Sequence, residues 1–130
     1  MPLERTGTWE GWQWKLTSSR DGDGEATDVA LVHPDGGRRR CGFSGPVVYP
    51  DAAVNAYIGR QEGSPTVVLG RCVAARELRL YSDGKVLPFT CDVEADGVRY
   101  WLHLSKSASV GSLSVRGVTP DGAFEQPLHG

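Results

Sequence analysis

The sequence is poor in cysteine and contains no motif that would put cysteines to use. Its three cysteines, Cys41, Cys72 and Cys91, are an odd number without a Cys-x-x-Cys spacing. This count fits neither a disulfide framework nor a zinc site. We therefore expect reduced, mostly buried thiols; the alternative is one disulfide and one free thiol.

Long apolar runs and net charge are also lacking. No apolar run approaches the length of a membrane-spanning helix, and the first residues lack the basic and apolar regions of a secretion signal. The formal net charge of -2 offers no field that would attract nucleic acid or an acidic membrane. We expect a soluble, cytoplasmic protein whose partner is neither nucleic acid nor a membrane.

Motifs of catalytic and metal sites are missing as well. Serines are plentiful, but none stands in the G-x-S-x-G pattern of a nucleophile elbow. The histidines, His33, His103 and His129, have no spacing that indicates a zinc site. We expect no catalytic residue, no metal and no cofactor.

The acidic stretch SSRDGDGEATD at residues 18–28 is the best candidate for a cation site. It lacks the EF-hand order of acidic residues and the bidentate glutamate that closes that loop. Asp-Gly pairs recur along the chain, and they favour tight hairpins because both residues tolerate positive φ. We therefore interpret the stretch as a turn between strands, with Asp21, Asp23 and Glu25 in solvent.

Short strands at regular intervals are the dominant pattern. Segments such as WQWKL, DVALVH and TVVLGRC alternate or run apolar, and Gly, Pro, Asp and Ser separate them. About eight such segments predict a single domain over residues 1–130, an antiparallel β-sandwich of about seven to nine strands. A small closed β-barrel is the alternative. Residues 51–58 have helical spacing but also fit an irregular strand, so the fold has at most one short helix.

Two Asp-Gly turns predict strand registers. A two-residue turn at Asp83-Gly84 sets Leu80 opposite Leu87, and one at Asp96-Gly97 sets Val93 opposite Tyr100. The second register also places Cys91 in the core, opposite Leu102 and near Phe89. In one continuous ladder, Phe89 would have to hydrogen-bond both neighbouring strands, so a bulge is expected at Pro88.

The strand VRYWLHL supplies the predicted binding residues, Trp101, His103 and Arg99. Alternation turns them away from the face of Tyr100, Leu102 and Leu104. An exposed tryptophan beside a cation and a titratable ring has the composition of an interface anchor. The alternative is that a second sheet covers Trp101, and the pattern leaves both open.

The stretch VVLGRCVAARELRLYSDGKVLPFTC, followed by SVGSLSVRGVTPDG, resembles immunoglobulin-like β-sandwich domains of small uncharacterised proteins from high-GC bacteria. The likeness covers residues 67–122 and lies in strands that end in Gly-Arg or in Asp-Gly turns. It implies a sandwich fold and a non-catalytic role. We expect a non-enzymatic module that binds another protein, within a larger assembly. The alternatives are a small-ligand or carbohydrate binder that uses exposed aromatics, and a hydrolase with an unrecognised site.

Overall fold

The computed structural model describes residues 3–49, 51–73, 75–106 and 111–128, and all regular structure in these residues is β-strand. The strands form three antiparallel four-stranded sheets, which confirms the predicted all-β class. The chain forms two compact units, Met1–Pro46 and Val47–Gly130. The single domain over residues 1–130 stays a prediction.

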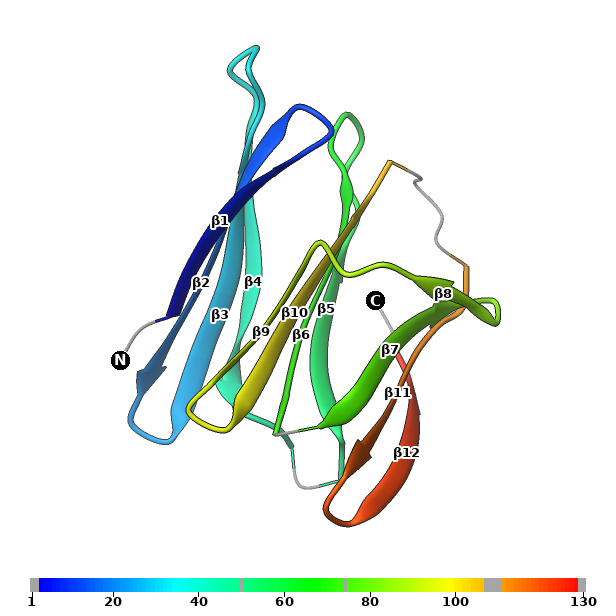
Figure 1. Cartoon of the computed structure of the whole chain (residues 1–130). Coiled ribbons are helices and arrows are strands. Elements are labelled where there is room, and N and C mark those ends of the chain that lie inside the picture. Colours follow the sequence, from blue (N-terminus) through cyan, green and yellow to red (C-terminus); the bar gives the residue numbers. More distant parts are fainter. Residues whose placement is uncertain (1–2, 50, 74, 107–110, 129–130) are drawn as a thin grey trace. The chain divides into compact units, whose positions relative to one another are not determined.

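The N-terminal unit is one sheet, sheet A, whose four strands follow one another in sequence order. Figure 1 shows these strands side by side, coloured from blue to cyan. Each pairs with the next through a hairpin. Their bounds are Leu3–Trp9 for β1, Trp12–Asp21 for β2, Gly24–Val32 for β3 and Arg38–Pro46 for β4.

Local turn chemistry explains the hairpins of sheet A. Glu10 and Gly11 join β1 to β2 with φ values of 49° and 84°, the positive values that a type I′ turn needs. Between β3 and β4, the amide of His33 donates to the carbonyl of Gly37 at 2.8 Å. Gly36 has a φ of 98° within that loop, so the tight hairpin expected at an Asp-Gly pair is confirmed there.

Glu25 corrects the prediction that the acidic stretch lies in solvent. It is 2% exposed and accepts hydrogen bonds from Ser18 Oγ at 2.5 Å and Arg20 Nε at 3.0 Å. The cause is the register, because β2 and β3 pair as far as Asp21 and Gly24 and leave a turn of only two residues. Asp23 is exposed as predicted, and the side chain of Asp21 lies outside the described residues.

The C-terminal unit is a β-sandwich of two sheets, which confirms the predicted architecture. Sheet B has the order β5-β6-β10-β9, and sheet C has the order β12-β11-β7-β8. The bounds in sheet B are Val54–Gly59 for β5, Thr66–Val73 for β6, Cys91–Ala95 for β9 and Val98–Ser105 for β10. Those in sheet C are Arg76–Ser82 for β7, Lys85–Leu87 for β8, Leu113–Thr119 for β11 and Gly122–Pro127 for β12.

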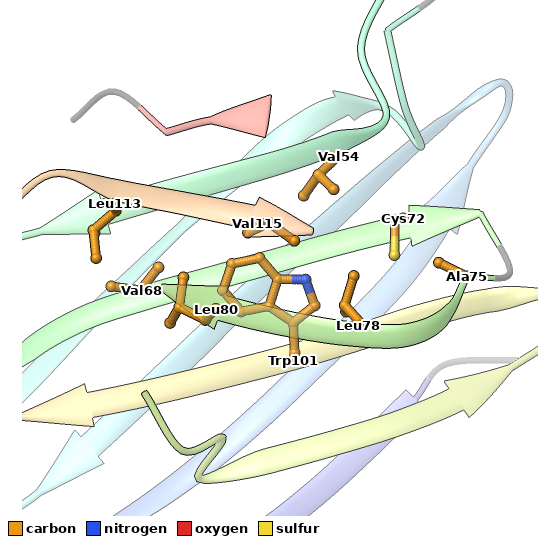
Figure 2. Packing of buried hydrophobic residues seen from close by; sticks show 9 residues of the cluster. All are labelled: Val54, Val68, Cys72, Ala75, Leu78, Leu80, Trp101, Leu113 and Val115. Atoms are coloured by element: carbon orange, nitrogen blue, oxygen red, sulfur yellow. The ribbon is translucent and has the colours of Figure 1, made fainter. Parts of the chain in front are cut away.

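One apolar core joins sheets B and C, and Figure 2 shows Trp101 at its centre. Sheet B contributes Val54, Val68, Cys72 and Trp101. Sheet C contributes Leu78, Leu80, Leu113 and Val115. Full burial of one valine or leucine side chain stabilises a fold by about 1.5–3 kcal/mol. The cluster therefore holds the two sheets together.

The segment between β8 and β9 corrects the predicted bulge. Because β8 lies in sheet C and β9 in sheet B, the chain changes sheets between Leu87 and Cys91. Both predicted hairpins exist, with Leu80 opposite Leu87 and Val93 opposite Tyr100. A bulge at Pro88 is unnecessary, because the two ladders lie in different sheets.

The structure has twelve strands in the described residues, more than the seven to nine expected. The sequence pattern does not indicate β1 or β12, leaves the segment of β5 open between helix and strand, and merges β8 with β9. β1 and β12 are edge strands with mostly exposed or half-buried side chains, so they show little apolar alternation.

Residues 51–58, for which helix and strand were both open, contain the start of β5. None of the described residues is helical, so this part of the chain has no helix that could cross a bilayer. Each of the three sheets described has two edge strands, and the closed-barrel alternative is therefore not what forms.

Candidate functional site

The predicted binding residues lie on β10, but they do not form an exposed surface. Trp101 is 0% exposed and belongs to the core between sheets B and C. Sheet C covers this face of β10, which is the alternative that the sequence left open. Trp101 is therefore a core residue and not an exposed aromatic platform.

His103 and Arg99 also have structural roles. His103 is 5% exposed, and its Nδ1 lies 2.7 Å from the carbonyl oxygen of Pro88. Burial lowers the pKa of His103, so the ring is neutral near pH 7 and donates its Nδ1–H to that carbonyl. Arg99 donates to the two carboxylate oxygens of Asp92 at 2.9 and 2.6 Å, which raises the pKa of Arg99.

The three cysteines form no disulfide among the described residues. Cys72 is fully buried in the core of the C-terminal unit, whereas Cys91 is only half-buried. The sequence prediction of a buried Cys91 is therefore wrong, because β9 is an edge strand of sheet B. In the part of the chain that the structure describes, no three His, Cys, Asp or Glu side chains gather in a way that could hold a metal ion.

The outer face of sheet C carries a row of three charged side chains on neighbouring strands. Arg79 of β7 lies opposite Arg116 of β11, and Arg116 lies opposite Glu125 of β12. Arg79 alternates with buried Leu78 and Leu80, so it points away from the core. We call Arg79, Arg116 and Glu125 the charged row.

Arg116 is held from two sides. Its Nε lies 3.1 Å from Oε2 of Glu125, and its guanidinium carbon lies 4.4 Å from the centre of the Tyr81 ring. The ion pair and the cation–π contact together fix the plane of the guanidinium. Glu125 engages the Nε and Nη2 edge, so the Nη1 donors remain open for another acceptor.

Arg79, in contrast, has no hydrogen bond and no ion pair among the described residues. It faces Arg116, and like charges directly opposite each other destabilise a strand pair. On the other side β8 ends at Leu87, which is opposite Leu80. The position that would face Arg79 falls on Pro88, beyond the end of the strand. From β12 to β7, the row is negative, positive and positive.

A β-bulge adjoins the charged row. β7 has two residues, Glu77 and Leu78, where β11 has only Gly117. Glu77 has a φ of 52°, a left-handed conformation that costs a non-glycine residue roughly 1–2 kcal/mol. A Cβ on Gly117 would lie 2.9 Å from the Phe124 ring, so a larger residue would crowd the bulge. Bulges re-aim the side chains beside them and are frequent next to functional sites.

A groove of about 640 Å³ lies on the same face. Its charged lining is the charged row together with Glu77. Its other lining residues include Tyr81, Val118, Ala123 and Phe124. Val86, opposite Tyr81, is 54% exposed and extends the apolar surface. Arginine, tyrosine and apolar surface together have the composition that is enriched at protein interfaces.

Sequence reasoning missed this site, although part of its signal is present. The patterns ELRLY and SVRGV each place an arginine between apolar residues, which predicts that Arg79 and Arg116 point outward. The pattern cannot show that the two arginines face each other, because β7 and β11 are far apart in sequence. Long-range pairing creates the site.

Comparison with models of protein families, with curated proteins and with solved structures finds no match to this chain. Function is therefore inferred from the residues of the site.

Proposed function

We propose that this protein is a non-enzymatic interaction module that binds another protein through the outer face of sheet C. The observation that carries the proposal is the unpartnered Arg79 opposite Arg116 in the charged row. The free protein tolerates this like-charge pair, although it opposes the pairing of β7 with β11. A binding partner that supplies a negative charge would relieve this repulsion.

The composition of this face supports a protein partner. Arginine and tyrosine are the residue types that, with tryptophan, contribute most binding energy in protein interfaces. The exposed Val86 and the groove lining at Phe124 add apolar surface beside the charges. The resemblance of residues 67–122 to immunoglobulin-like domains agrees with a binding role.

Affinity capture with matched variants tests the proposal. We expect the immobilised wild-type chain and the Arg60→Glu variant to recover the same protein from the native lysate, and the Arg79→Glu variant to lose it. Arg60 is an exposed arginine between β5 and β6 of sheet B, so it controls for the reversal of charge. Recovery of the same proteins by all three chains would contradict the proposal.

One observation favours the small-ligand alternative, and it lies in the N-terminal unit. The rings of Trp12 and His33 pack with centroids 4.8 Å apart. A cavity of about 450 Å³ beside His33 is lined by polar groups that include Thr8, Gln13 and Arg38. Aromatic rings with nearby donors suit a sugar or another small polar ligand. Loss of ligand-induced thermal stabilisation in a Trp12→Ala variant would identify such a site.

A further inference from the structure

The charged row is one negative charge short. Glu125 neutralises Arg116 through an ion pair at 3.1 Å, but no acidic side chain among the described residues does the same for Arg79. Arg79 and Arg116 are directly opposite each other and line the same groove, so the position that an anion could share lies between them. An anion at this position would convert the repulsion between the two arginines into attraction to a shared partner.

We propose that this position binds the carboxylate of an aspartate or glutamate that belongs to an extended segment of a partner protein. The carboxylate lies against Arg79 and the open Nη1 donors of Arg116. This inference rests on the proposed function and specifies the chemistry of the partner.

The geometry suits a carboxylate. A guanidinium presents a planar fork of N–H donors that matches two carboxylate oxygens. Residues directly opposite on neighbouring strands have β-carbons about 4.5–5.5 Å apart, so one carboxylate can reach both arginines. Because Tyr81 and Glu125 already hold Arg116, binding costs that side chain little conformational freedom.

The surroundings favour a single acidic side chain over a polyanion. Glu77 and Glu125 line the same groove as the two arginines, so carboxylates lie among its positive charges. Nucleic acids and anionic membranes require a broad basic surface, which these carboxylates interrupt. In an extended segment, side chains two positions apart point the same way. An apolar residue two positions from an acidic residue on Arg79 therefore points to the same face, where Val118 lines the groove.

The test uses the full chain and a fluorescent peptide with blocked ends, in which a glutamate has a valine two positions before it and two positions after it. A peptide with glutamine in place of glutamate is the matched control. We expect fluorescence polarisation at low ionic strength to show at least tenfold tighter binding of the glutamate peptide. Tenfold corresponds to about 1.4 kcal/mol. A hydrogen bond between charged groups contributes about 1.5–3 kcal/mol, so the effect is within reach of this site.

Substitutions test whether the glutamate peptide binds at the charged row. Arg79→Ala is expected to weaken binding of the glutamate peptide at least tenfold. Arg79→Lys is expected to weaken it less, because lysine keeps the charge and loses the planar fork. Arg60→Ala removes an equal charge from an exposed position beyond β5 and should stay within twofold of wild type.

Two results would overturn the inference. One is equal binding by the wild-type and Arg79→Ala chains. The other is displacement of the peptide by inorganic phosphate, or by phosphatidylserine vesicles, at lower concentrations than by unlabelled peptide. Such displacement would assign the site to phosphate groups or to a lipid surface.

Failure of this inference can be told apart from failure of the proposed function. The chain could capture a protein in an Arg79-dependent way and yet show no preference for the glutamate peptide. That result would support the protein-binding function and contradict the proposal that the partner supplies an acidic segment. Arg79-dependent peptide binding, without any Arg79-dependent protein, keeps the carboxylate site and contradicts the protein-binding function.

Discussion

The indole ring of Trp101 lies directly on Gly70 of the neighbouring strand. The two residues are opposite each other in the pairing of β10 with β6, and a Cβ on Gly70 would overlap Cζ2 of Trp101. The core of the C-terminal unit therefore requires a residue without a side chain beneath its largest ring. Trp14 lies on Gly7 of sheet A in the same way, and a Cβ on Gly7 would overlap Cζ2 of the Trp14 ring.

The first prediction follows from this close approach. Gly70→Ala forces the Trp101 ring to move within a packed core, which typically costs about 1–3 kcal/mol. Denaturant unfolding of the variant measures the loss. Adding Trp101→Leu to Gly70→Ala should remove part of the cost, since the two residues share one contact. Additive losses in the double variant would contradict this explanation.

The sequence predicts the turns of this protein better than it predicts the packing of its sheets. The Asp83-Gly84 and Asp96-Gly97 turns could be predicted with their registers, because left-handed turn residues determine a hairpin locally. The burial of Trp101 could not be predicted, because it depends on packing against sheet C, whose strands lie elsewhere in the sequence. The role of Pro88 was missed for a related reason. A change of sheet and a bulge both end a ladder at that residue.

The candidate site shows the same division. Outward orientation of Arg79 and Arg116 could be predicted from strand alternation within each strand. Their juxtaposition could not, since it depends on the register of β11 against β7 and on the bulge at Glu77. The predicted residues Arg99 and His103 do occupy one strand, but Asp92 and Pro88 already engage them.

A second prediction concerns the like charges of the charged row. Arg79→Ala removes the repulsion with Arg116 and should raise the free energy of unfolding by roughly 0.2–1 kcal/mol in the absence of a partner. Chemical unfolding at low ionic strength measures the gain. Added salt should shrink the difference between wild type and variant, because salt screens exposed charges. A loss of stability would show that Arg79 stabilises the free fold, contrary to this explanation.

A third prediction concerns His103 and pH. Burial lowers the pKa of His103 below its usual value of 6.5, so the unfolded chain binds a proton more readily than the folded chain. The stability that neutral His103 supports is fully present above about pH 6.5 and declines as the pH falls toward the lowered folded pKa. The His103→Asn variant keeps an N–H donor for Pro88 and does not titrate. Its stability should therefore fall less between pH 7.5 and 5. Parallel curves for the two proteins would contradict the assignment.

A fourth prediction concerns thiol reactivity. Burial raises the pKa of the Cys72 thiol to about 11, and its side chain is 0% exposed. Because the thiolate is the reactive form, Cys72 should label with an aromatic disulfide reagent at least about 100-fold more slowly in the native protein than in denaturant. Peptide mapping should show the half-buried Cys91 and Cys41 labelled before Cys72. Labelling of Cys72 as fast as Cys91 would mean that the core between sheets B and C opens readily.

The most direct test of the central claim places a photo-crosslinking amino acid on the outer face of sheet C. Ala123 is an exposed lining residue of the groove, and Arg60 on sheet B serves as the control position. Irradiation in native lysate should give a discrete protein adduct with the crosslinker at residue 123, and the adduct should disappear when Arg79→Glu is added. It should be absent with the crosslinker at residue 60. The same adduct from both positions, or one that survives Arg79→Glu, would contradict binding through this face.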